Sequence, residues 1–323
     1  MNTPEKHIAI SVKQAASLIA SSEGGRGLRF FQRAEIGRSE HLKRQHFLSS
    51  RFPDYNGEYQ LSSTFERKGW RITLRGRPDA VYREGGNLVV EEIKTIAAPA
   101  EIFDKLEAAD LACFRAQLDL YTHLLRLQNP AERLLCRLYL VNIAAGGDRI
   151  LDYLPDAIGT ESALDRALEI VAAEAEAEHR RREALRNAAD DLPFPYPDIR
   201  PLQEEMFREV AIAAGPDGRL LLSAPTGTGK TAGTLYPALK EAFRTGKKLF
   251  FATSRNTQKR AVQEFLTRLQ AEAVNFSALI LTARAGICPN DAESCDPEEC
   301  PYIADFGEKF FRSRLEEEFA AGG

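Results

Sequence analysis

Residues 220–231, LLLSAPTGTGKT, restrict the possible fold of the chain more than any other segment. An apolar run leads directly into a loop in which Gly227 and Gly229 permit the backbone conformations of an anion-binding nest. Lys230 follows, and residues 231–243 have the composition of a helix whose N-terminus would face a bound phosphate. This order of strand, loop and helix predicts an α/β domain with a parallel sheet and a phosphate-binding loop.

The same loop predicts a site for ATP and magnesium. Its backbone N–H groups and Lys230 would hold the phosphates, and the Thr231 hydroxyl would bind the magnesium ion. Upstream, an aromatic ring at Tyr196 and the amide of Gln203 could contact adenine, although this proline-rich stretch is also typical of a linker. The predicted nucleotide site comprises Tyr196, Arg200, Gln203, Thr226, Gly227, Thr228, Gly229, Lys230 and Thr231.

Composition and patterning indicate more than one domain. The chain has 323 residues, of which 44% are hydrophobic, enough for two buried cores. Residues 161–190 contain no Gly or Pro and predict one long helix, which the proline-rich residues 192–201 would end. Further strands are predicted at 247–253 and 278–282, alternating with helices in α/β style. We therefore expect three parts, at 1–158, 159–192 and 193–323.

The first part contains a predicted β-hairpin over residues 71–95, with a two-residue Gly-Gly turn at 85–86. If the strands pair directly across that turn, Asp79 lies opposite Glu92, with β-carbons about 5 Å apart. Facing carboxylates repel each other, and a divalent cation between them removes the repulsion. Lys94 shares a face with Glu92 and could position a metal-bound water or a phosphate, as phosphodiester hydrolysis requires.

Asp79 and the run Glu92-Ile93-Lys94 resemble the PD-(D/E)XK nuclease motif. His41 resembles the histidine of the upstream Gly-x-x-x-His element of the RecB-like branch, and residues 117–121, QLDLY, resemble its Gln-x-x-x-Tyr helix. The resemblance covers roughly the first 125 residues and implies a PD-(D/E)XK nuclease fold for this part. It implies the catalytic residues Asp79, Glu92, Lys94, Gln117 and Tyr121, and magnesium or manganese held by His41, Asp79 and Glu92.

Downstream of residue 194 the chain resembles the iron-sulfur helicases of superfamily 2, the XPD and DinG group. Gln203 resembles their adenine-reading glutamine, and the loop at 224–231 their phosphate-binding loop. The resemblance implies an incomplete RecA-like P-loop domain with a parallel sheet, and the start of an iron-sulfur insertion near residue 284. It also implies a first DNA-contacting motif at Thr253, Arg255 and Thr257.

Cys288, Cys295 and Cys300 lie close enough in sequence to share one metal centre. Thiolates suit zinc or an iron-sulfur cluster, and their spacing alone does not separate the two. The helicase resemblance implies a 4Fe-4S cluster whose fourth ligand is missing from this chain. Unligated thiols in a loop are the third alternative.

Taken together, these motifs predict the N-terminal fragment of an ATP-dependent DNA helicase fused to a metal-dependent deoxyribonuclease, acting in DNA repair or processing. The chain alone should lack ATPase turnover, because no Walker B acid pair and no second motor domain follow the loop. The expected substrate is DNA that is single-stranded or has single-stranded ends. Two alternatives stay open: a catalytically idle nuclease fold that binds DNA or a partner, and a P-loop phosphotransferase.

Charge and hydropathy add little to this prediction. The formal net charge is -4, so any contact with DNA must use local basic patches. We find neither a signal peptide nor an apolar run of the length needed to span a membrane, which predicts a cytoplasmic protein without membrane contact.

Overall fold

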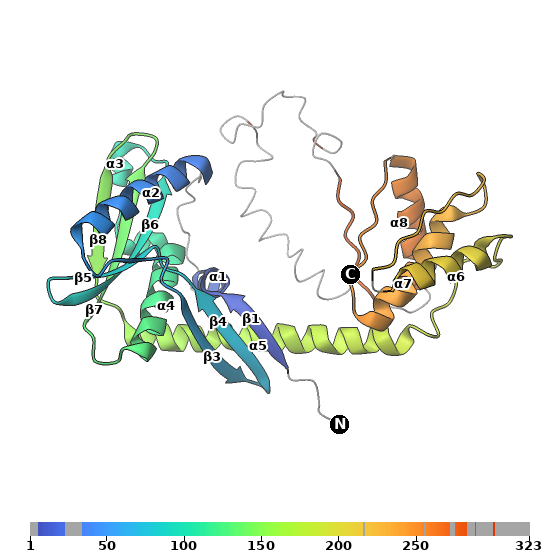
Figure 1. The fold of residues 1–323 in the computed structure, drawn as a ribbon, viewed down its shortest axis with the longest axis horizontal. Coiled ribbons are helices and arrows are strands. Elements are labelled where there is room, and N and C mark those ends of the chain that lie inside the picture. Colours follow the sequence, from blue (N-terminus) through green and yellow to red (C-terminus); the bar gives the residue numbers. More distant parts are fainter. Residues whose placement is uncertain are drawn as a thin grey trace. The chain divides into compact units, whose positions relative to one another are not determined.

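The structure is a computed structural model that describes residues 6–22, 34–215, 217–254, 256–271, 275–282, 288 and 300. The chain forms two compact units, Met1–Glu176 and Ala177–Gly323. Figure 1 shows the strands gathered in the first unit and helices α6, α7 and α8 in the second. The division into three parts, with boundaries at residues 158 and 192, stays a prediction.

The first unit contains two mixed sheets. The three-stranded sheet has the order β1-β4-β3, with β1 (His7–Ser11) parallel to β4 (Trp70–Gly76) and β3 (Leu61–Arg67) antiparallel. The five-stranded sheet has the order β2-β5-β6-β7-β8, and only the β6–β7 pair is parallel. Its strands are β2 (Asn56–Gly57), β5 (Ala80–Glu84), β6 (Asn87–Ile96), β7 (Leu134–Asn142) and β8 (Asp148–Tyr153). The unit is therefore a mixed α/β fold.

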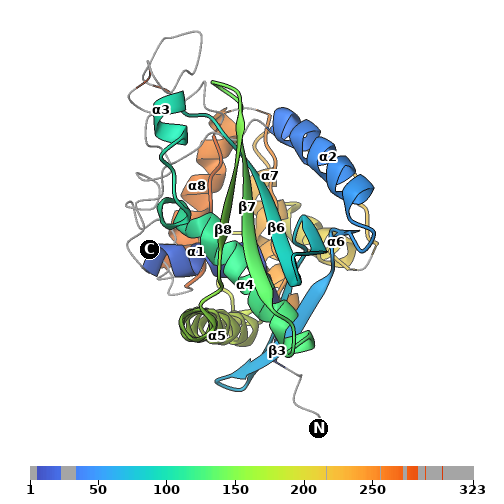
Figure 2. The same ribbon diagram turned by 90° about the vertical axis from the view of Figure 1, so that its left-hand side faces the viewer.

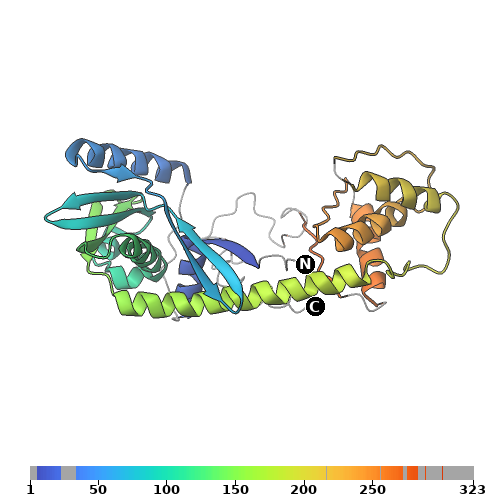
Figure 3. The same cartoon turned by 60° about the horizontal axis from the view of Figure 1, so that its bottom comes forward.

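Helices cover both faces of the five-stranded sheet. Figures 2 and 3 show α2 (Ala34–Arg51) on one side of it and α4 (Ala112–Gln128) on the other. The remaining elements of this unit are α1 (Val12–Ser22), α3 (Ala100–Phe103), the 3-10 helix η1 (Ala108–Leu111) and α5 (Ala157–Ala188). The long helix expected over residues 161–190 corresponds to α5, which continues into the second unit.

The predicted hairpin forms between β5 and β6 with the expected register, but its first strand begins at Ala80, because residues 70–76 form β4 of the other sheet. Glu84 pairs with Asn87 and Ala80 with Glu91 across β5 and β6. The turn residues Gly85 and Gly86 have φ of 58° and 81°, the left-handed conformation that a two-residue hairpin turn requires. Asp79 directly precedes β5, so the register leads to the predicted position opposite Glu92.

Strand β6 is the central element because both of its faces are buried. Val90 belongs to the main core, together with Leu124 of α4 and Leu138 of β7. Val89 points the other way, into a smaller cluster with Tyr82 and with Leu48 of α2. Eight of its ten residues, from Val89 to Ile96, are buried, as expected for an inner strand covered on both sides. A polar side chain on β6 is therefore removed from water whichever face it occupies.

The described part of the second unit is helical. Its helices are α6 (Gln203–Ala213), α7 (Lys230–Thr245) and α8 (Asn256–Ala271). Their core includes Leu235, Phe243 and Phe265, with Ala189 and Leu192 from the segment that precedes them. Across the described residues of the whole chain, no helix is both long and apolar enough to cross a membrane.

The three strands predicted for the second unit are wrong as judged from its described residues. The runs near 220–222, 247–253 and 278–282 have no strand pairing there, and Leu221, Phe250 and Leu281 are 99%, 84% and 72% exposed. Apolar residues do not make a strand unless a neighbouring chain accepts and donates its backbone hydrogen bonds. The described core of this unit forms between helices instead, and a RecA-like parallel sheet is not shown.

Candidate functional site

Four of the predicted catalytic side chains meet between β6 and α4. Lys94 Nζ donates to Glu92 Oε1 at 2.7 Å and to Gln117 Oε1 at 3.3 Å. Gln117 Nε2 donates to Glu92 Oε1 at 2.7 Å and to the Tyr121 hydroxyl oxygen at 3.1 Å. Glu92 and Lys94 lie on one face of the strand because they are two residues apart, and Gln117 and Tyr121 are one helical turn apart. The result is a connected polar cluster inside an apolar core.

Glu92 is the least satisfied member of this cluster. Its side chain is buried, and Oε2 has no hydrogen-bond partner. Burial raises the pKa of Glu92 and the charge of Asp79 raises it further, whereas the Lys94 ammonium group lowers it. A buried acceptor without a partner destabilises the fold, so an unsatisfied oxygen at this depth calls for a specific explanation.

Tyr121 is fixed by a close backbone approach. A β-carbon at Gly76, the last residue of β4, would lie 2.7 Å from Val12 Cγ2 and closer still to the Tyr121 ring. Only glycine fits this position without displacing a neighbour. Burial and the negative charge of Glu92 raise the pKa of Tyr121, so its hydroxyl keeps its proton at neutral pH. It therefore acts as a hydrogen-bonding group.

His41 and Asp79 form a second pair beside the cluster. His41 Nδ1 of α2 lies 3.4 Å from Asp79 Oδ1, and the Ile93 backbone N–H donates to Asp79 Oδ2 at 2.7 Å. Asp79 is thereby tied to the strand that carries Glu92 and Lys94. His41 and Asp79 are partly exposed, at 31% and 17% of their side chains, so a solute can reach them.

The donor set suits a hard divalent cation, although it is not gathered around one point. Among the described residues, no group of three or more His, Cys, Asp or Glu side chains is arranged to hold a metal ion. The unpartnered oxygen of Glu92 and the carboxylate of Asp79 are nevertheless the ligand types that Mg²⁺ and Mn²⁺ prefer, and His41 adds a nitrogen donor.

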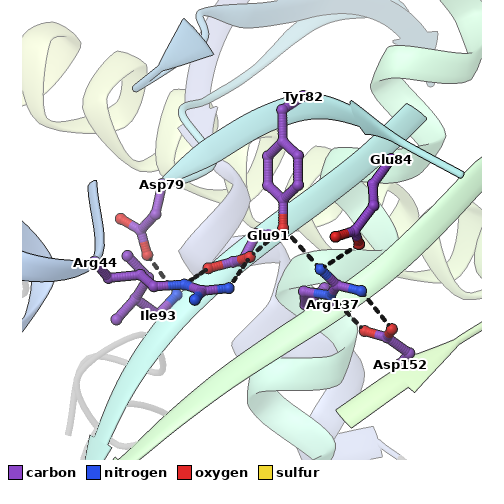
Figure 4. A network of polar contacts seen from close by, with 8 residues as sticks. All are labelled: Arg44, Asp79, Tyr82, Glu84, Glu91, Ile93, Arg137 and Asp152. Atoms are coloured by element: carbon purple, nitrogen blue, oxygen red, sulfur yellow. Dashed lines mark hydrogen bonds and ion pairs between the residues drawn. The ribbon is translucent and has the colours of Figure 1, made fainter. Parts of the chain in front are cut away.

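The opposite face of β6 carries a second, fully paired polar network (Figure 4). Arg44 of α2 donates through Nε and Nη2 to the two carboxylate oxygens of Glu91, at 2.7 and 2.9 Å. The Tyr82 hydroxyl also donates to Glu91, and Arg137 donates to Tyr82 and to both oxygens of Asp152. Sequence analysis missed this network. The signal was the doublet Glu91-Glu92 inside an apolar strand, since adjacent residues must point to opposite faces.

Two further side chains near the site were not identified from the sequence. Lys13, at the start of α1, lowers the pKa of Glu92 through its charge. The Lys94 ammonium group lies 5.1 Å from the centre of the Phe114 ring. Neither has a local sequence signal, because both come from elements that approach β6 only in the folded unit.

In the second unit, the loop before α7 contains two glycines in the left-handed conformation. Gly227 and Gly229 adopt φ of 83° and 75°, and α7 begins at Lys230. Lys230 Nζ donates to the carbonyl oxygens of Ala224 and Pro225 at 2.8 and 2.7 Å, which folds the loop around the ammonium group. Helix α7 is sixteen residues long, and the loop leads directly into its first turn.

The residues predicted to read adenine are engaged by the protein itself. Gln203 is buried, and its amide accepts from the Arg200 backbone and donates to the Gly229 carbonyl, while the Arg200 side chain donates to Gly227. Tyr196 packs against Phe265 with ring centres 6.1 Å apart, and the Arg268 guanidinium lies 5.2 Å from its ring centre. Of the other predicted nucleotide ligands, Thr228 donates to the Pro225 carbonyl, and Thr226 is exposed and Thr231 partly exposed.

The remaining predicted residues are only partly covered by the structure. Thr253 and Thr257 are exposed, with Thr257 in the first turn of α8, and Arg255 lies outside the described residues. Cys300 is buried and Cys288 is partly exposed, whereas Cys295 is outside the described residues. The shared metal centre of these cysteines stays a prediction.

Comparison with known proteins identifies the family of the chain. The solved structure described as "Crystal structure of SSO0001" aligns with 53% of this chain and 78% of its own at 16% identity, with a TM-score of 0.35, which is too low to indicate a shared fold. No match was found among curated proteins. The family model of the PD-(D/E)XK nuclease superfamily matches residues 14–304, nearly the whole chain. The protein therefore belongs to the PD-(D/E)XK nuclease superfamily.

Proposed function

We propose that the first unit hydrolyses phosphodiester bonds of DNA in the presence of magnesium or manganese. The observation that carries the proposal is Glu92 Oε2, a buried carboxylate oxygen without a hydrogen-bond partner. It lies beside a lysine that is already oriented, and family membership points to the same chemistry.

His41, Asp79 and Glu92 would hold the cation. When bound, such an ion stabilises negative charge on the scissile phosphate and lowers the pKa of a water ligand. The Ile93 backbone N–H keeps Asp79 oriented, so that one of its carboxylate oxygens stays directed toward His41. The cation would also offset the repulsion between Asp79 and Glu92, which adds to burial in raising the pKa of Glu92.

Lys94 would position the attacking water and donate a hydrogen bond to the phosphate. Its ammonium group is buried and held between Glu92 and Gln117, so little side-chain entropy is lost when substrate binds. Gln117 in turn bonds to the Tyr121 hydroxyl, which fixes the amide plane. Lys13, whose charge acts on Glu92, and the exposed side chain of Arg77, two residues before Asp79 in the chain, would contact the DNA backbone.

The proposal is tested by cleavage of end-labelled DNA with manganese, comparing the parent with Glu92→Ala and Lys94→Ala. We expect cleavage by the parent and a loss of about 100-fold or more in both variants. Asp152→Asn, on the far side of the sheet, serves as a control that should cleave normally. A folded parent that binds DNA and manganese yet never cuts single strands, gaps or flaps would favour the idle-nuclease alternative.

A second candidate function is nucleotide binding by the second unit. It is favoured by the two left-handed glycines and by Lys230, which the loop wraps through its own carbonyl groups. ATP would displace these carbonyl contacts, with Thr231 binding its magnesium ion. The test is fluorescence titration with a labelled ATP analogue. Lys230→Ala should abolish binding, whereas the control Lys247→Ala, at an exposed position, should bind normally. Equal affinity in both variants would contradict it.

The wider role is proposed from the sequence motifs. A helicase motor would deliver single-stranded ends of DNA to the nuclease site, with a 4Fe-4S cluster at Cys288, Cys295 and Cys300 and a task in cytoplasmic DNA repair. Thr253, Arg255 and Thr257 would contact the strand. A P-loop phosphotransferase, the alternative, requires no DNA affinity in the second unit, so salt-dependent DNA binding would argue against it.

A further inference from the structure

Helix α2 contacts two neighbouring residue pairs of the β5–β6 hairpin. His41 lies beside Asp79, and Arg44, one helical turn later, binds Glu91. Asp79 directly precedes Ala80, whose ladder partner is Glu91. Residues three apart share one face of a helix. The two contacts therefore come from one side of α2 and reach adjacent positions of the hairpin.

The Arg44–Glu91 contact is the stronger of the two. The side chain of Arg44 is 10% exposed and that of Glu91 is fully buried. Both carboxylate oxygens of Glu91 are engaged by the guanidinium fork, whose plane also lies over the Tyr139 ring at 4.0 Å. Two parallel hydrogen bonds of this kind set both the distance between the guanidinium and carboxylate groups and their relative orientation. It fixes the rotation of α2 about its own axis at this turn.

The apolar anchors of α2 lie further along the chain. Leu48 packs into the cluster with Tyr82, and Phe52, just beyond the helix, stacks on the Tyr82 ring with centres 4.4 Å apart. At the other end, Gly37 brings the helix backbone close to Thr95 of β6. These contacts hold α2 against the sheet, but apolar packing constrains rotation less than a buried fork does.

We infer that Arg44, through its buried fork to Glu91, is a positioning residue that keeps the His41 imidazole directed at the metal site. The inference rests on the proposed function, because it assumes that His41 binds the cation. Residues that orient a metal ligand without touching the metal typically contribute 10–100-fold to affinity. Lysine at position 44 would keep the charge but lose the fork.

The test is the dissociation constant of Mn²⁺ for the full chain without DNA, measured by electron paramagnetic resonance. The variant Arg44→Met/Glu91→Gln removes both charges, so that neither is left buried and unpaired. We expect its Mn²⁺ affinity to fall about 10-fold and that of Arg44→Lys to fall by a similar factor. Asp152→Asn is the matched control: it breaks another bidentate pair of the network, on β7 and β8, and should leave affinity unchanged.

A double-mutant cycle separates positioning from general loosening of the fold. When His41 is already replaced by alanine, Arg44→Met/Glu91→Gln should have no further effect on Mn²⁺ affinity. An equal loss with and without His41, or no loss in the parent background, would overturn the inference and leave the proposed function standing. If Glu92→Ala binds Mn²⁺ as tightly as the parent, the proposed function fails, and the inference fails with it.

Discussion

Glu91 and Glu92 are adjacent buried carboxylates on one strand, yet their surroundings differ. Glu91 accepts three hydrogen bonds, two from Arg44 and one from Tyr82, and both of its oxygens are used. Glu92 has two donors on Oε1 and none on Oε2. The same residue type at the same depth is thus complete on one face of the sheet and incomplete on the other.

The two carboxylates therefore have different roles: Glu91 holds the fold together, and Glu92 belongs to the proposed site. Folding removes both carboxylates from water, and only a full set of partners offsets that loss. Glu91 has such a set and joins α2 to the sheet. Glu92 keeps an unpaired oxygen, so the fold tolerates a destabilising group at this position. We attribute that tolerance to the cation that the proposed function requires.

The largest expected effect comes from neutralising each glutamate in turn. Glu91→Gln leaves Arg44 buried without its full partner and should lower the free energy of unfolding by about 3 to 5 kcal/mol. Glu92→Gln should lower it by less, because burial raises the pKa of Glu92 and folding therefore already disfavours its charge, although the variant also removes the counter-charge of the buried Lys94. Urea unfolding followed by the fluorescence of Trp70 reports on the first unit alone, because the chain has a single tryptophan.

A larger loss in Glu92→Gln than in Glu91→Gln would reverse the comparison. It would mean that Glu92 is the structural carboxylate and that its unpaired oxygen has no functional meaning. Arg137→Lys, which weakens the same network without touching Glu92, is a control for the cost of disturbing β7.

A third carboxyl group, that of the half-buried Asp119 of α4, shows the cost of burial that its partners do not fully offset. Burial raises the pKa of Asp119 to about 6, against the lowering effects of a hydrogen bond from Tyr153 and the charge of Arg115. Between an unfolded value near 4 and this folded value, the folded state binds more protons. Stability should therefore fall by about 3 kcal/mol as the pH rises through this window, and level off above it.

Asp119→Asn removes this titration. The free energy of unfolding of the variant minus that of the parent should increase by about 2 to 3 kcal/mol from pH 4 to pH 7, because only the parent loses stability over this range. The measurement is urea unfolding of both proteins at the two pH values. A difference that does not depend on pH would show that the partners of Asp119 fully offset its burial, as those of Glu91 do.

A smaller effect is expected from Gly76→Ala. The new methyl group would collide with Val12 and with the Tyr121 ring, which should cost about 1 to 3 kcal/mol of stability. Displacement of Tyr121 would also disturb Gln117 and Lys94, so DNA cleavage should fall more than stability predicts. The check is cleavage rate under conditions where the variant is fully folded. Normal cleavage would mean that the hydroxyl of Tyr121 does not orient the cluster.

The smallest effect is expected at the rim of the site. Arg77 and Glu58 form an ion pair at 3.2 Å, with 59% and 63% of their side chains exposed. Glu58→Gln should change stability by less than about 1 kcal/mol, because solvent screens exposed pairs. Thermal unfolding at low and high salt tests this. A loss of stability in Glu58→Gln larger than that in Glu91→Gln would contradict the expectation that buried ion pairs contribute more than exposed ones.

The sequence predicted the parts of this site that depend on local geometry. A Gly-Gly turn sets the hairpin register, and a spacing of four residues puts Gln117 and Tyr121 on one helical face. The Arg44–Glu91 fork could not be predicted, because it requires knowing that α2 lies over that face of β6. The prediction of strands at 220–222, 247–253 and 278–282 was wrong for a related reason. An apolar run becomes a strand only if another strand pairs with it, and the local pattern does not show whether one does.

The most direct test of the central claim is a crystal structure of the chain with Mn²⁺, using the anomalous signal of the ion. We expect a manganese peak within bonding distance of Glu92 Oε2, with Asp79 and His41 as further ligands and no ion at Glu91. A peak elsewhere, with Glu92 Oε2 still without a partner, would contradict it.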